Sequence, residues 1–147
     1  MTARRAPGTG GHRPLGTGGR RPLVALPGRF AICRFPPDAP PPAWVFHEGA
    51  SVWSITRTPD ELSLVCDEDD LPPSVEPAPE RWRAFRVQGV IPFGEIGVIV
   101  GITAPLAAAG ISVFVVSTHD TDLVLVPADH AAGAARVWQH AGHELIG

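Results

Sequence analysis

The chain contains no lysine and no tyrosine, and its only thiols are those of Cys33 and Cys66. The missing lysine excludes Schiff-base chemistry and the phosphate-binding lysine of a nucleotide-binding P-loop. The missing tyrosine removes one common general acid. Each cysteine lies inside an apolar, strand-like run, so we predict two buried free thiols rather than a redox or metal-binding pair.

Long apolar runs are also missing. No run reaches the roughly 18 residues of a membrane span, and the arginines near the start are not followed by the apolar stretch of a signal peptide. We therefore expect a cytoplasmic protein. With 147 residues and a hydrophobic fraction of 44%, the chain is long enough for one domain, or for two small lobes that share a core.

Acidic residues are absent from the N-terminus, where positive charge is concentrated. Residues 1–21 carry five of the twelve arginines, so from Pro22 onward seven arginines stand against fifteen Asp and Glu, a net charge of −8. Such an acidic body favours neither nucleic acid nor membrane as a partner. The first segment is rich in Gly and Pro, and we predict a disordered basic tail over 1–21. Contact with RNA or anionic lipid is its alternative role.

Two segments of the chain resemble each other. Residues 51–65 read SVWSITRTPDELSLV and residues 112–126 read SVFVVSTHDTDLVLV; aligned without a gap at an offset of 61, five of fifteen positions are identical. In each segment, apolar residues flank a short polar stretch, which is the pattern of a strand, a tight turn and a second strand. The repeat indicates a duplicated fold.

The second half of the chain predicts one complete unit. We expect a strand over 82–89, a helix from Ile96 to Gly110, strands over 111–117 and 122–126, a helix from Asp129 as its cap to His140, and a last strand over 143–146. Pro105 should kink the first helix or remove one of its hydrogen bonds. The order β-α-β-β-α-β predicts a ferredoxin-like, α+β unit with an antiparallel four-stranded sheet and both helices on one face.

The first half of the chain predicts a reduced copy of that unit. A strand over 23–35 is broken near Pro27 and Gly28, and a proline run follows with at most one helical turn before the hairpin. We therefore divide the chain into the tail 1–21, a reduced repeat 22–67, an acidic, proline-rich linker 68–80 and a complete repeat 81–147. The central strands of the second unit are almost continuously apolar, so the other repeat or a second chain should cover them, the latter as a homodimer.

The stretch PFGEIGVIVGITAPLAAAGISVFVVSTHDTDLVLV, residues 92–126, resembles an ACT domain. Together with the upstream TRTPDELSLV it is similar to the small bacterial tandem-ACT proteins, and to the ACT pairs of aspartate kinases and CASTOR-type arginine sensors. The resemblance spans residues 23–146. It implies a regulatory protein that senses a free amino acid where the first helix of one ACT domain meets the hairpin of a neighbour. One good site is expected, because the first repeat is short of a helix.

A free amino acid carries a carboxylate and an ammonium on one carbon, so its pocket needs an anion site beside an anionic group. The free amides of a helix start over 94–97 suit the carboxylate, and Asp120 and Asp122 offer charge-assisted bonds to the ammonium. In the alternative interpretation, Asp120 and Thr121 only hold the turn, and Glu95 only favours the helix start. The candidate ligand-binding residues are Phe93, Gly94, Glu95, Ile96, Gly97, Ser117, Thr118, Asp120, Thr121, Asp122, Thr56, Thr58 and Glu61.

The remaining expectations concern partners and chemistry. We expect the helix start to lie far from its own turn, so the turn over 56–61 or that of another chain should complete the pocket. His119 has no second ligand at a telling distance, which predicts no metal and no cofactor. No nucleophile pattern such as Gly-x-Ser-x-Gly occurs, so we predict a non-enzyme that signals through a separate effector protein. A dimerisation or protein-interaction module without a small ligand is the first alternative, and an uncharacterised hydrolase is the second.

Overall fold

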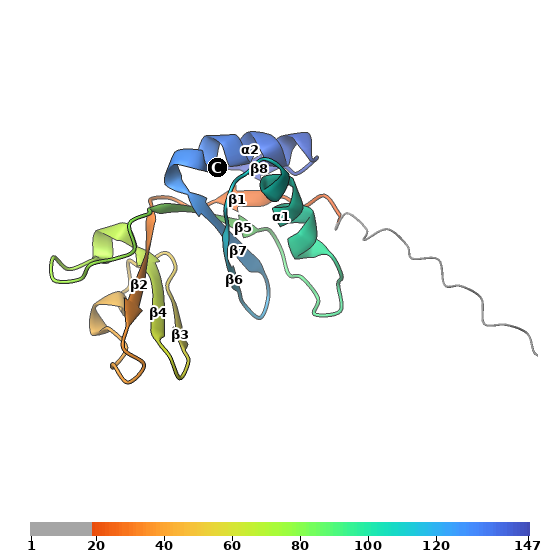
Figure 1. Cartoon of the computed structure of the whole chain (residues 1–147). Coiled ribbons are helices and arrows are strands. Elements are labelled where there is room, and N and C mark those ends of the chain that lie inside the picture. The colour runs from red at the N-terminus through yellow and green to blue at the C-terminus, as the bar shows by residue number, and fades with distance from the viewer. Residues whose placement is uncertain (1–18) are drawn as a thin grey trace, which may run out of the picture.

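The protein is built on an eight-stranded sheet that divides into two parts, and two helices pack on one of these parts (Figure 1). The computed structural model describes residues 19–147, so the predicted tail lies outside the described residues except for 19–21. The strands are β1 Leu23–Ala25, β2 Phe30–Phe35, β3 Ser54–Arg57, β4 Leu62–Asp67, β5 Trp82–Val87, β6 Phe114–Ser117, β7 Asp122–Pro127 and β8 Leu145–Ile146. The helices are α1 Val98–Ala108 and α2 Ala131–His140, and single 3₁₀ turns form at η1 Ala43–Val45, η2 Glu68–Asp70 and η3 Ala128–His130.

The second repeat has the predicted βαββαβ order, from β5 to β8. Its helices cover one face of the sheet, where Phe85, Ile102 and Trp138 are buried together. The sheet has one strand more than predicted, because β1 enters between β5 and β8, antiparallel to β5 and parallel to β8. The predicted break near Pro27 and Gly28 is thus the point where the chain passes from the second repeat into the first.

The first repeat is reduced, with strands in the order β3-β4-β2 and the single turns η1 and η2 in place of helices. Part of the segment predicted as a linker runs along β2, where the Ala78 N–H donates to the carbonyl of Ile32 at 2.8 Å. In the second repeat, the Leu26 N–H donates to the carbonyl of Ala84 at 2.9 Å in the same way. Each repeat therefore supports the first strand of the other, as an approximate two-fold requires.

The hairpins correspond with an offset of 60 residues, not the 61 of the sequence alignment. Arg57 pairs with Leu62 before a four-residue turn, and Ser117 pairs with Asp122 before another. Asp122 is therefore the counterpart of Leu62, whereas the alignment matched it to Glu61. The alignment maximised identities between apolar residues, but the turn length sets the register of the strands.

Three apolar clusters fill the fold. One lies between the helices and the part of the sheet that belongs to the second repeat. Another lies between the two parts of the sheet, where Phe30, Val65 and Leu125 pack together. The third lies in the first repeat and contains Cys33 and Cys66. Both cysteines are free and buried, which confirms the prediction for the thiols.

Pro105 removes one hydrogen bond from α1, as predicted, and His143 replaces it. The carbonyl of Gly101 would accept the N–H four residues on, which Pro105 lacks. His143 Nε2 lies 3.2 Å from that carbonyl oxygen, and the ring is only 6% exposed. Asp129, in contrast, does not cap α2: it lies within η3, and no side chain bonds at the start of that helix.

Candidate ligand-binding site

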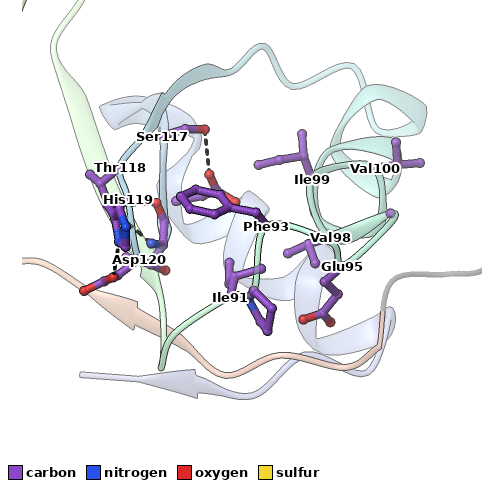
Figure 2. A pocket seen from close by; sticks show the side chains of 14 residues that line it. Ile91, Phe93, Glu95, Val98, Ile99, Val100, Ser117, Thr118, His119 and Asp120 are labelled. Atoms are coloured by element: carbon purple, nitrogen blue, oxygen red, sulfur yellow. Dashed lines mark hydrogen bonds and ion pairs between the residues drawn. The ribbon is translucent and has the colours of Figure 1, made fainter.

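A pocket with a cavity volume of about 360 Å³ lies where the loop after β5 and the start of α1 meet the turn between β6 and β7 (Figure 2). Both walls belong to the second repeat. The lining residues are Ile91, Pro92, Phe93, Glu95, Gly97, Val98, Ile99, Val100, Ser117, Thr118, His119, Asp120, Thr121 and Asp122.

One wall is the uncapped start of α1. Gly97 takes the N-cap position with φ of 87°, a left-handed conformation that glycine adopts without steric cost. No side chain caps the helix, and its first turn contains no acid. The first α-helical bond of this turn runs from the Gly101 N–H to the Gly97 carbonyl at 2.9 Å. The amides of residues 98–100 therefore lack acceptors within the helix and carry its positive end.

The opposite wall is the β6–β7 turn, which two threonines shape. The Thr118 N–H donates to the carbonyl of Thr121 at 2.8 Å, and the Thr121 N–H donates to the Thr118 hydroxyl at 3.2 Å. The Thr121 hydroxyl donates to the carbonyl of Val87 at 2.6 Å. These bonds give both threonines a role in the turn itself.

The two aspartates place negative charge on this wall. Asp122 accepts a bond of 2.6 Å from the Ser117 hydroxyl, which fixes its carboxylate at the end of β6. Asp120 lies 2.7 Å from Nδ1 of the exposed His119. Each carboxylate keeps further lone pairs for other donors. The pocket thus has a positive helix end on one side and carboxylates on the other.

The turn closes on the loop of its own repeat, so the expectation that the helix start lies far from its own turn is wrong. The Ile91 N–H donates to the carbonyl of Asp120 at 2.7 Å, and the rings of Phe93 and His119 meet edge to face at 5.0 Å. The reason is topological. Because β5 and β7 are antiparallel neighbours, the end of β5 and the turn before β7 lie at the same edge of the sheet.

The predicted residues of the first hairpin lie elsewhere. Thr56 lines a separate groove of about 190 Å³ between the hairpins, together with Ser117. Thr58 accepts bonds from its own turn, and Glu61 lies 3.4 Å from Arg34. Two predicted residues of the second repeat, Gly94 and Ile96, lie on the loop but do not line the pocket.

The apolar lining, apart from Phe93, was not predicted. Ile91 and Pro92 precede the predicted turn, and residues 98–100 form the first turn of α1. The absence of polar residues at a helix start could have indicated that the free amides face a pocket. Glu95 was predicted, but its carboxylate forms an ion pair with Arg21, which lies in the segment predicted as a disordered tail.

In the first repeat, the hairpin bonds directly to the proline-rich loop after β2. Arg57 is the counterpart of Ser117, and its guanidinium donates to the carbonyl of Ala39 at 2.7 Å and to that of Pro37. These bonds tie the proline-rich loop to the first hairpin. The first repeat also lacks a helix start with free amides, since η1 spans only three residues.

Metal and relay geometries are not formed by the described part of the chain. Among residues 19–147, no three His, Cys, Asp or Glu side chains converge so that they could hold a metal ion. Ser117 bonds to Asp122 and His119 to Asp120, so these groups do not line up as a nucleophile, a base and an orienting acid.

Comparisons with known proteins agree with this geometry. The ACT-domain family model matches residues 78–138, and a separate N-terminal-domain model matches residues 28–74. A crystal structure of a protein from Agobacterium tumefaciens is 39% identical with a TM-score of 0.79, covering 87% of this chain and 93% of that one. Residues 78–138 thus form an ACT domain, and the chain is related to the Agrobacterium tumefaciens protein over most of its length.

Named relatives point to regulation. The human protein CASTOR3P is 34% identical over 86 residues, which are 50% of this chain and 53% of that protein. The human cytosolic arginine sensor for mTORC1 subunit 1 is 41% identical over 61 residues, which are 41% of this chain and 18% of that protein. The chain thus spans about half of the first relative and less than a fifth of the second.

The regulatory subunit of aspartate kinase from Thermus thermophilus shares the fold. Its TM-score is 0.52 at 16% identity, covering 77% of this chain and 91% of that subunit. By name, one of these relatives is a cytosolic arginine sensor and another is the regulatory subunit of a kinase. Within residues 19–147, no helix is both long enough and apolar enough to cross a membrane.

Proposed function

We propose that the protein is a regulatory module that binds one free amino acid in the pocket of its second repeat. The observation that carries the proposal is the pairing of charges across the pocket: free amides over 98–100 on one wall, and the carboxylates of Asp120 and Asp122 on the other. This arrangement matches the carboxylate and ammonium of a free amino acid. The apolar residues between the walls suit its carbon skeleton.

The relatives named as arginine sensors make L-arginine the first amino acid to test. The chain gives a physical reason to include it. In the first repeat, the Arg57 guanidinium donates to the carbonyls of Ala39 and Pro37, between the first hairpin and the proline-rich loop. A cationic side chain would also meet the two aspartates of the turn. A signal from such binding would pass to a separate effector protein.

A thermal-shift screen with the twenty common amino acids tests the proposal. An amino acid present at 100 times its dissociation constant adds about 2.7 kcal/mol to the free energy of unfolding, so the melting temperature should rise clearly for at least one of them. The proposal fails if none of the twenty shifts the melting temperature of the full chain.

A protein-interaction or dimerisation module is the second candidate, favoured by exposed apolar side chains near the pocket mouth. Val90, Phe93, Ile96 and Val100 are 66, 81, 86 and 47% exposed. Such a patch is typical of a surface that another protein covers. Sedimentation velocity distinguishes the two candidates. An interaction module should associate through this patch, Phe93→Ser should abolish the association, and no amino acid should stabilise the chain.

A further inference from the structure

Arg21 joins the N-terminal segment to the rim of the pocket. Its guanidinium binds the carboxylate of Glu95, and the two side chains are only 21% and 31% exposed. Water and salt screen such a partly buried pair less than an exposed one. Glu95 lies on the loop that lines the pocket, on the side away from the turn (Figure 2).

The backbone of Arg21 is anchored in the interior. Its N–H donates to Nδ1 of His143 at 3.1 Å, and Nε2 of the same ring reaches the carbonyl of Gly101 in the first turn of α1. A neutral ring with its proton on Nε2 satisfies both bonds. The carbonyl of Gly101 is free for this bond because Pro105 has no N–H. A continuous set of contacts therefore runs from α1 through His143 to Arg21.

The loop between β5 and α1 has few other ties. Phe93 and Ile96 are mostly exposed, and the Glu95 N–H bonds only within the loop, to the carbonyl of Pro92 at 2.9 Å. The bond from Ile91 to Asp120 fixes the beginning of the loop. Near the end of the loop, within residues 19–147, the ion pair with Arg21 joins it to another part of the chain.

We propose that Arg21 is a positioning residue of the site: through Glu95 it holds residues 92–97 so that the free amides of α1 and the ring of Phe93 face the pocket. This inference rests on the proposed function. It also changes the role of Glu95. Because Arg21 neutralises its carboxylate, Glu95 positions the loop, and the ammonium of the amino acid is left to Asp120 and Asp122.

Four variants of the full chain test this role: Arg21→Gln, Glu95→Gln, the double variant, and the charge exchange Arg21→Glu with Glu95→Arg. Arg20→Gln is the control, because it removes a neighbouring arginine that makes no ion pair in residues 19–147. Hydrogen–deuterium exchange over residues 92–97, without any amino acid, measures the loop directly. We expect about tenfold faster exchange in the single and double variants, and exchange like that of the wild type in the control.

The dissociation constant of the amino acid that gives the largest thermal shift is the second measurement. We expect Arg21→Gln and Glu95→Gln each to raise this dissociation constant about five- to tenfold. The double variant should raise it no further, and the charge exchange should restore part of the lost affinity. Wild-type exchange and affinity in Arg21→Gln would overturn the inference. If no amino acid binds the wild type, the proposed function fails, while the exchange measurement still decides whether Arg21 holds the loop.

Discussion

Phe30 and Trp82 lie opposite each other at the one position where β2 and β5 pair. Each is the first residue of the first strand of its repeat, so the approximate two-fold relates one to the other. Phe30 is fully buried in the cluster that the two parts of the sheet share, and Trp82 packs against the same cluster. The two repeats therefore have a common core and should unfold together.

Phe30→Ala tests this common core. Removing a buried phenylalanine costs about 3–5 kcal/mol of unfolding free energy, through lost burial and the cavity that remains. We expect urea unfolding to stay a single transition, with fluorescence and far-ultraviolet circular dichroism coincident. Two separate transitions, or a loss below about 1 kcal/mol, would show that the repeats are stabilised independently.

His143 and Pro105 should be coupled. His143→Ala leaves the carbonyl of Gly101 without its partner, at a cost of about 1–3 kcal/mol. In Pro105→Ala the helix can supply its own N–H to that carbonyl, so the same substitution should cost less there. A double-mutant cycle in urea measures the difference. Equal costs in both backgrounds would mean that His143 does not replace the missing bond.

The buried thiol of Cys66 predicts a loss of stability at high pH. A hydrogen bond with Cys33 and burial raise the pKa of Cys66 above its ordinary value. Above about pH 8.5 the thiol ionises in the unfolded chain but stays protonated in the folded one. The free energy of unfolding therefore falls by up to about 1.4 kcal/mol per pH unit. Cys66→Ala should therefore show a shallower decline between pH 8.5 and 10 in urea unfolding. Parallel curves would contradict the raised pKa.

Much of the fold followed from local patterns in the sequence. The alternation in the two hairpins predicted the repeat, Pro105 predicted the lost helix bond, and the break near Pro27 marked the crossing between repeats. The pairing of β1 with β5 and β8 was not predicted, because strands distant in the chain pair through tertiary contacts that periodicity does not encode. The offset between the hairpins was one residue off for another reason: the alignment followed identical residues, whereas the turn length sets the correspondence.

The candidate site was predicted in part. The polar turn and the glycine-rich helix start both line the pocket, since each carries its own local signal. The role of Arg21 was missed, because a basic segment with few apolar residues is typical of a solvated tail, and only tertiary structure brings it to Glu95. Thr56, Thr58 and Glu61 were included because the helix start was expected to lie near the hairpin of the other repeat, whereas it lies near the turn of its own.

The number of sites should be one per chain. In the first repeat, Arg57 bonds the hairpin to the proline-rich loop, and that repeat has no helix start with free amides. Calorimetric titration of the full chain with the amino acid that stabilises it most should give a stoichiometry of one. A stoichiometry of two would show that the first repeat also binds, despite Arg57.

Calorimetry of Asp122→Asn tests the central claim, that the turn carboxylates bind the ammonium of an amino acid. The asparagine keeps the shape and can still accept a bond from Ser117, but it removes the charge. Asp60→Asn, in the turn of the first hairpin, is the matched control. We predict that Asp122→Asn weakens binding by about 1.5–3 kcal/mol, the contribution of a charged hydrogen bond, while Asp60→Asn leaves the affinity unchanged. Wild-type affinity in Asp122→Asn would contradict the account and place the ammonium elsewhere.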